Sequence, residues 1–152
     1  MPKIQRKKTI FYQVINIKVM FDKDELDGIC IVTSNESHHD IAVEASKRGI
    51  HVMCEKPLAM NRHDLLSMLE AAEENEIIHG VNFIYRENPA VKKLKKLLEE
   101  GFIGKGYEGN FQYTEVNGLT GSPRWRGMKS KGGTGGVLAD LGSHLIDLVQ
   151  FA

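Results

Sequence analysis

Residues 29–57, ICIVTSNESHHDIAVEASKRGIHVMCEKP, decide the fold of this chain. The run at residues 29–33 is short, apolar and rich in β-branched side chains, as in a strand buried within a parallel sheet. A helical pattern follows from about residue 38 to residue 48, and Gly49 is a typical helix-ending residue. A second apolar run occupies residues 50–54. Strand, helix and strand in this order predict a βαβ unit with a right-handed crossover.

The alternation of strand and helix patterns continues downstream. Residues 61–64, NRHD, resemble a helix-capping box with aspartate in place of glutamate, and apolar positions continue this helix to about residue 75. Residues 77–83 predict the next strand. Asn88 followed by Pro89 predicts the start of another helix, which ends at Gly101. The pattern predicts an α/β fold with helices on both sides of the sheet.

The two ends of the chain are less regular. Residues 10–20, IFYQVINIKVM, partly alternate and are compatible with a strand, although no partner is evident. Residues 107–116 alternate loosely, as in a half-exposed antiparallel strand. Residues 117–134 form a long, glycine-rich and basic loop. We therefore predict a domain boundary near residue 104.

The composition of the chain indicates which kinds of partner and cellular location to expect. The chain has 152 residues, of which 41% are hydrophobic and 26% charged, as in a soluble globular domain. Twenty basic and twenty acidic residues balance, so charge does not favour nucleic acid or an anionic membrane as a partner. Since no secretory signal or membrane-spanning run occurs, we predict a cytoplasmic location. Cys30 and Cys54 lie in strand-like runs and are predicted to be reduced core residues.

Polar side chains follow the predicted strands. In an open α/β sheet, ligands bind beyond the carboxyl ends of the strands. Residues 33–36, 55–57 and 82–86 fall at such ends. Lys56 precedes a proline of fixed φ and is a well-placed cationic donor, although a lysine considered alone is more often a surface residue. Three polar strand ends together favour a binding site.

Residues 135–152, GGVLADLGSHLIDLVQFA, form a glycine-rich approach to an amphipathic helix. Asp140 and His144 are four positions apart, so they would project from one helix face. A carboxylate and an imidazole so placed can orient a small molecule and transfer a proton, although a solvated contact is the alternative. A metal site made of His38, His39, Asp140 and His144 is a weaker hypothesis, because no H-x-x-x-H or H-E-x-x-H spacing occurs.

Three motifs in order resemble one enzyme family. Glu55-Lys56-Pro57 resembles the E-K-P motif of the glucose-fructose oxidoreductase, inositol dehydrogenase and MocA (Gfo/Idh/MocA) family of nicotinamide-dependent sugar oxidoreductases. Residues 33–38, TSNESH, are similar to the family's T-x-N-x-x-H turn, and residues 132–147 are similar to its G-G-G-x-L-x-D-x-G-x-H-x-x-D segment. The resemblance extends from about residue 22 to the end. Residues 80–82 and 125–126 resemble the anhydrofructose reductase branch.

The resemblance implies a role for each matching residue. Lys56 would hydrogen-bond the reacting oxygen, His144 would give or take its proton, and Asp140 would orient the substrate or relay that proton. The residues implied to line the cofactor, NAD or NADP, are Thr33, Ser34, Asn35, Glu36, His38, Glu55, Lys56, Asn82, Trp125 and Arg126. Many relatives have N-Y-R where this chain has Ile84-Tyr85-Arg86, and Asn82 is the candidate to replace that asparagine.

The family pattern also predicts that this chain is a fragment. The family begins with a strand, a G-x-G-x-x-G turn and a helix, whereas no glycine precedes Phe21 here. The glycines at 132–136 follow no strand and are predicted to be a flexible lead into the helix. We expect an incomplete doubly wound, Rossmann-like parallel sheet at residues 1–104, as a partial dinucleotide-binding domain. Residues 105–152 would then start an α+β substrate domain.

Two functions of different classes remain. The first is an NAD- or NADP-dependent oxidoreductase, or a piece of one, that acts on a sugar or polyol, with no metal ion in its site. The second is a truncated, non-catalytic remnant that acts as a binding or dimerisation module. In both cases the chain is compatible with a homo-oligomer. For the chain alone, we expect weak or absent dinucleotide binding and no turnover.

Overall fold

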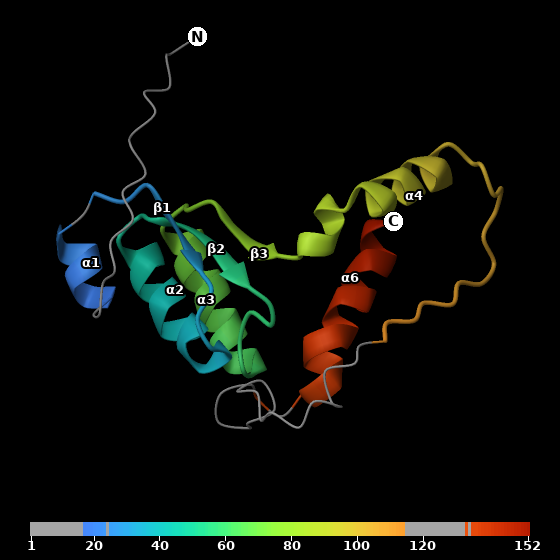
Figure 1. Cartoon of the computed structure of the whole chain (residues 1–152). Helices are drawn as coiled ribbons and strands as arrows, with labels where there is room; N and C mark the ends of the chain where they lie inside the picture. Colours follow the sequence, from blue (N-terminus) through green and yellow to red (C-terminus); the bar gives the residue numbers. More distant parts are fainter. Residues whose placement is uncertain (1–16, 24, 115–132, 134) are drawn as a thin grey trace, which may run out of the picture.

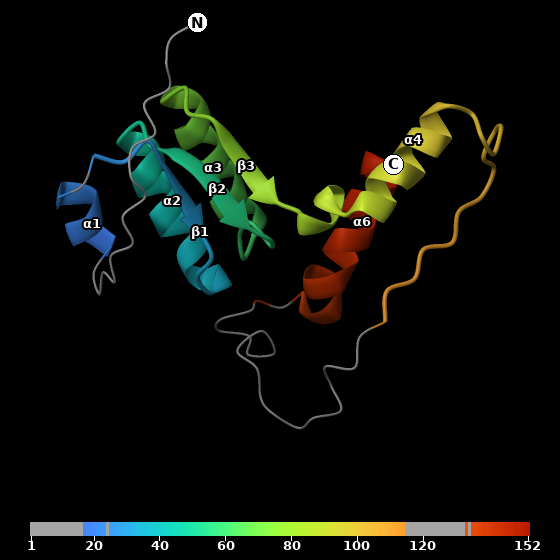
Figure 2. The ribbon, with the colours of Figure 1, turned by 45° about the horizontal axis from the view of Figure 1, so that its top comes forward.

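A three-stranded parallel sheet and the helices that connect its strands form the first part of the molecule. The computed structural model describes residues 17–23, 25–114, 133 and 135–152. In chain order the elements are β1 (Gly28–Ile31), α2 (His38–Lys47), β2 (His51–Glu55), α3 (Arg62–Glu74) and β3 (His79–Asn82). The strand order is β1-β2-β3, and α2 and α3 lie side by side (Figures 1 and 2). The predicted βαβ unit is confirmed, and the sheet is Rossmann-like.

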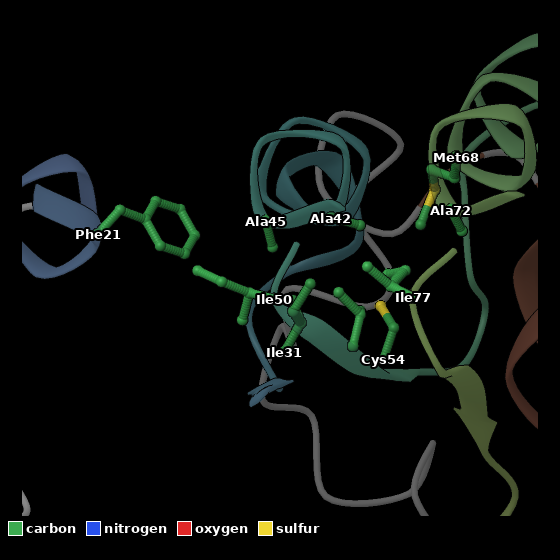
Figure 3. Packing of buried hydrophobic residues seen from close by; sticks show 10 residues of the cluster. Phe21, Ile31, Ala42, Ala45, Ile50, Cys54, Met68, Ala72 and Ile77 are labelled. Atoms are coloured by element: carbon green, nitrogen blue, oxygen red, sulfur yellow. The ribbon is translucent and has the colours of Figure 1, made fainter. Parts of the chain in front are cut away.

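The core lies between one face of the sheet and the two helices. Ile31 and Cys54 of the strands lie in one buried cluster with alanines of α2 and with Met68 of α3 (Figure 3), and Val52 belongs to the same cluster. Small side chains such as Ala45 let the helix approach the sheet closely. Burial, and secondarily the Glu55 carboxylate, raises the pKa of the Cys54 thiol to about 12. Cys54 is therefore an inert core residue, as predicted.

Side chains that cap the helices explain where they begin and end. The Asn61 side chain accepts a hydrogen bond from the Asp64 N–H at 2.9 Å and starts α3. The Asn88 side chain accepts one from the Ala90 N–H at 2.9 Å and starts α4 (Pro89–Glu99). Gly49, with φ at 72°, follows α2 in the left-handed conformation that glycine adopts without strain. The predicted positions of these helix ends are confirmed.

The opposite face of the sheet is open in the described part of the chain. Because α2 and α3 pack on the same face, alternate strand residues point away from both helices. Cys30 is exposed for this reason, so the prediction that it is a core residue is wrong. Its register partner Met53 is 46% exposed. The prediction of helices on both sides of the sheet is met on one side only among the residues that the structure describes.

The segment before the sheet contains a helix, α1 (Ile17–Lys23), at the described end of residues 10–20, which the sequence pattern left unassigned. The helical spacing turns Phe21 toward the core, where it is 6% exposed and faces Ile50 (Figure 3). The Arg48 guanidinium lies 5.3 Å from the centre of the Phe21 ring. The helix therefore packs Phe21 against the turn between α2 and β2. Residues 10–16 lie outside the described residues.

The strand predicted for residues 107–116 is absent from its described portion, residues 107–114. In this portion the backbone pairs with no neighbouring strand, and Tyr107 is 88% exposed. A strand needs a partner to satisfy its backbone N–H and C=O groups, which explains why the loose alternation does not produce one. Of the predicted loop at residues 117–134, only Gly133 is described.

A second group of helices lies beyond the end of β3. The chain passes from β3 through a 3₁₀ turn, η2 (Ile84–Glu87), into α4. A π-helical turn, η4 (Leu138–Gly142), continues as α6 (Ser143–Phe151), which packs beside η2 (Figures 1 and 2). Within the described ranges, no helix is long and apolar enough to cross a membrane. This arrangement brings Asp140 and His144 to the sheet.

Candidate active site

The carboxyl ends of the three strands meet at one edge of the sheet. Glu55 ends β2, and Asn82, its partner in the parallel register, ends β3. The Asn82 side-chain amide donates to the Glu55 carboxylate at 2.6 Å. Lys56 follows Glu55 directly, and Thr33 and Ser34 lie in the turn after β1. The structure therefore places these predicted residues at the edge where open α/β sheets bind ligands.

Lys56 joins this edge to the helix that carries Asp140. Its Nζ donates to the Asp140 Oδ1 atom at 2.9 Å and also to the Asp140 backbone carbonyl. The exposed fraction of the side chain is 11% for Lys56 and 37% for Asp140. A mostly buried ammonium requires such partners, because burial of an unpaired charge is costly. Two predicted residues that are 84 positions apart in the chain are thus in direct contact.

His144 is buried beside this ion pair. It is 7% exposed, and its ring lies 4.6 Å from the Tyr85 ring and 6.0 Å from the Phe83 ring, measured between centroids. In the part of the chain that the structure describes, its buried Nδ1 atom has no hydrogen-bond partner. A buried imidazole nitrogen without a partner is uncommon, which marks His144 as a candidate functional residue.

The environment of His144 favours the neutral ring. Burial lowers the pKa of its imidazole, and the positive charge of Lys56 lowers it further. The carboxylates of Asp140, Glu55 and Asp147 act in the opposite direction and only partly offset these two effects. A neutral imidazole can accept a proton, so His144 has the protonation state that a general base requires.

An ion pair that the sequence did not reveal fixes α6 against η2. The Arg86 Nε atom donates to both carboxylate oxygens of Asp147, at 3.1 Å and 2.9 Å, and Asp147 is 5% exposed. Asp147 lies one helical turn after His144, so this pair anchors the helix that carries the imidazole. Both residues stand in family-like motifs, as does Tyr85, whose hydroxyl lies 2.7 Å from that of Tyr113. Those motifs were the available signal.

His38 is placed differently from the other residues implied to line the cofactor. Its side chain is fully buried, with Nδ1 at 3.0 Å from the Pro57 carbonyl oxygen and Nε2 at 3.2 Å from the Thr33 carbonyl oxygen. His38 therefore ties the turn after β1 to the turn after β2. Asn35 is also buried, at 6% exposure, whereas Thr33 and Glu36 are exposed. Trp125 and Arg126 lie outside the described residues.

The histidines do not assemble a metal site in the described part of the chain. The His39 ring nitrogens face the Asp40 carboxylate at 2.8 Å and, across the contact between α2 and α3, the Ser67 hydroxyl at 3.3 Å. No group of three histidine, cysteine or carboxylate side chains among the described residues is arranged to hold a metal ion. The metal hypothesis, which required His39 beside His144, therefore has no geometric support there.

Comparison with known proteins decides the family. A family model described as an oxidoreductase family with an NAD-binding Rossmann fold matches residues 4–83, and a model of the GFO/IDH/MocA C-terminal domain matches residues 91–152. The chain belongs to the Gfo/Idh/MocA oxidoreductase family. The resemblance inferred from the three motifs is thereby confirmed, and Lys56 falls in the first match while Asp140 and His144 fall in the second.

Relatives within the Gfo/Idh/MocA family include sugar dehydrogenases and reductases. Levoglucosan dehydrogenase from Pseudarthrobacter phenanthrenivorans is 35% identical over 136 residues, which cover 87% of this chain and 34% of that protein. The 1,5-anhydro-D-fructose reductase from Ensifer adhaerens is 30% identical over 138 residues, which cover 91% of this chain and 41% of that protein. This chain therefore spans well under half the length of these relatives.

A solved structure supports the same assignment. Levoglucosan dehydrogenase in complex with NADH and levoglucosan superposes on this chain with a TM-score of 0.75 at 30% sequence identity. The superposition covers 91% of this chain and 38% of the solved chain. Most of this chain therefore has the fold of the matching part of that enzyme.

Proposed function

We propose that this chain carries the catalytic residues of an NAD- or NADP-dependent oxidoreductase that acts on a sugar or polyol. The contact of Lys56 with Asp140, beside the buried His144, is the observation that supports this proposal most strongly. In this proposal residues 1–104 supply the dinucleotide side of the site and Lys56. Residues 105–152 supply the substrate side with Asp140 and His144.

The residues at the sheet edge fit a nicotinamide dinucleotide. Thr33 and Glu36 are exposed in the turn after β1, and Glu55 and Asn82 pair at the ends of the next two strands. The unpartnered Nδ1 of His144, within the described residues, lies on the neighbouring helix. The polar groups at the strand ends would hold the cofactor, together with Ser34 and, beyond the described residues, Trp125 and Arg126, which leaves His144 for the substrate. When bound, the nicotinamide supplies hydride exchange with a carbinol carbon.

Lys56 and His144 would divide the work at the reacting oxygen. Among the described residues, the Lys56 ammonium donates two hydrogen bonds, both to Asp140, and its third N–H would serve the substrate oxygen. During oxidation His144 accepts the hydroxyl proton as the carbinol carbon loses its hydride, and in reduction the protonated ring returns that proton. Asp140 holds the ammonium in place. Oxidation of an alcohol and reduction of the carbonyl product both require this proton transfer.

A non-catalytic binding module is the second candidate. The open sheet face favours it, because Met53 is 46% exposed and Ile78 is 73% exposed there. Apolar strand residues in water are typical of surfaces that other protein segments cover. This candidate predicts a folded chain that assembles with a partner but does not bind a dinucleotide.

Titration of the purified chain with NADH and NADPH, followed by cofactor fluorescence, tests the proposal. Lys56→Met should weaken saturable binding about tenfold, since a hydrogen bond from a charged group is lost. Lys93→Met, on the exposed side of α4, is the matched control and should leave binding unchanged. Equal binding by both variants would contradict the role of Lys56 in the cofactor site, and absence of binding by the folded chain would favour the non-catalytic alternative.

A further inference from the structure

The helix that carries the candidate catalytic residues contains an irregular turn. In an α-helix each backbone N–H bonds to the carbonyl four residues earlier. In η4 the Ser143 N–H instead donates to the carbonyl of Leu138, five residues earlier. The carbonyl of Ala139 thereby loses the partner that a regular helix would give it. Turns of this π type contain an extra residue and are frequent at functional sites.

Two side chains donate hydrogen bonds to carbonyls of the π turn. The Ser143 hydroxyl donates to the Ala139 carbonyl at 2.7 Å. The Lys56 ammonium donates to the Asp140 carbonyl and to the Asp140 Oδ1 atom at 2.9 Å. The π turn is therefore stabilised from within the helix by a hydroxyl and from the sheet by an ammonium.

We propose that Ser143 is a positioning residue for Lys56. By bonding the Ala139 carbonyl, the Ser143 hydroxyl maintains the π turn, and the π turn presents the carbonyl and carboxylate of Asp140 together to the ammonium. This inference rests on the proposed function in so far as Lys56 is the donor to the substrate oxygen. The contact itself exists without substrate or cofactor.

The alternative conformation shows why the hydroxyl matters. If the turn closed to a regular α-helix, the Ser143 N–H would bond to the Ala139 carbonyl and the His144 N–H would bond to the Asp140 carbonyl. The His144 N–H would then compete with Lys56 for that carbonyl. Closure of the π turn to an α-helix would also rotate Asp140 relative to His144, since each α-helical residue advances about 100°.

Ser143→Ala and Ser46→Ala form a matched pair for the test. The Ser46 hydroxyl donates to the Ala42 carbonyl at 2.8 Å, also four residues earlier, but within the regular helix α2. Both substitutions remove the same type of bond, and only Ser143 belongs to the turn that contacts Lys56. Ser143→Thr keeps a hydroxyl, and Ser143→Val is its isosteric partner without one, which provides a second comparison if the alanine variant unfolds.

The readout is the Lys56 ammonium in proton–nitrogen NMR spectra of the chain labelled with ¹⁵N-lysine, with Lys56→Met used for assignment. A hydrogen-bonded, mostly buried ammonium exchanges slowly with water. We expect Ser143→Ala and Ser143→Val to accelerate this exchange about tenfold or more, whereas Ser143→Thr and Ser46→Ala preserve it. The pKa of His144 should rise toward its ordinary value in the first two variants, because Lys56 would move away from the ring.

Two results would overturn the proposal. One is a folded Ser143→Ala chain with an unchanged Lys56 signal and unchanged His144 titration. The other is an equal change in Ser46→Ala, which would indicate a general loss of helix stability. Both readouts are taken without cofactor, so failure of the nucleotide titration leaves this test intact. A protected Lys56 signal in a chain that binds no dinucleotide would count against the proposed function alone.

Discussion

His38 and His144 are both buried, yet their ring nitrogens are used in opposite ways. His38 is fully buried, and each ring nitrogen faces a backbone carbonyl, one after each of two strands. His144 is 7% exposed, and its Nδ1 atom has no partner among the described residues. A histidine whose two nitrogens both face backbone carbonyls links the segments that carry them, whereas one with an unpartnered buried nitrogen is a candidate functional residue. The first should matter for stability and the second for chemistry.

The largest effect on stability is expected at His38. His38→Leu should lower the free energy of unfolding by about 2 to 4 kcal/mol, because it removes a fully buried ring whose nitrogens lie at hydrogen-bond distance from the Pro57 and Thr33 carbonyls. Urea unfolding of the chain provides the measurement. His39→Leu, in the same helix but with a ring that is 28% exposed, is the control and should change stability by about 1 kcal/mol or less. Equal losses in the two variants would contradict the bridging role of His38.

A smaller loss is expected when the anchor of the His144 helix is broken. Arg86→Met leaves the buried Asp147 carboxylate without its partner and should cost about 2 kcal/mol, less than a fully buried pair because Arg86 is 45% exposed. Lys92→Met breaks the exposed pair with Glu87 and should cost about 0.5 kcal/mol or less. Thermal unfolding monitored by circular dichroism compares the two. A loss in Lys92→Met as large as in Arg86→Met would refute the anchor.

The smallest effect is expected at His144. His144→Phe should change stability near neutral pH by about 1 kcal/mol or less, since the ring contacts are kept and no described hydrogen bond to Nδ1 is lost. The wild-type chain should lose stability as the pH falls below about 6.5, the ordinary pKa of histidine, toward the lower folded-state pKa of His144. Over this interval the unfolded chain binds the proton and the folded chain does not.

The pH dependence separates the two histidines further. In His144→Phe the loss of stability that comes from protonation of His144 in the unfolded chain should disappear. The free energy of unfolding, measured from pH 5 to pH 8, should therefore depend less on pH than in the wild-type chain. An unchanged profile would mean that the environment of His144 does not lower its pKa. His38→Leu is the comparison variant, and it should keep the His144 contribution.

The parts of the fold that depend on local sequence were predictable. The strands and helices of residues 29–57 follow from short apolar runs and their flanking residues, and the Asn61 and Asn88 caps form where the sequence places them. The exposure of Cys30 was not predictable, because it depends on which face of the sheet the helices cover. The helix at Phe21 was missed because packing against Ile50 and Arg48 outweighs a weak alternation.

The candidate site was predictable in its members but not in its connections. The family-like motifs pointed to Lys56, Asp140 and His144, which the structure brings together. The π turn and the pair of Arg86 with Asp147 depend on contacts between distant segments, which sequence spacing does not encode. The catalytic and cofactor-binding roles, the boundary near residue 104, the cytoplasmic location and the homo-oligomer stay predictions.

The contact of Lys56 with Asp140 also has a consequence for the order of folding. It closes a loop of 84 residues, and the entropy lost on closing a loop grows with its length. The pairing of β1 with β2 joins segments that are much closer in sequence, so it can form earlier. We therefore expect the sheet edge to form first, with Lys56 exposed to water, and the candidate site to assemble only in the last stage of folding.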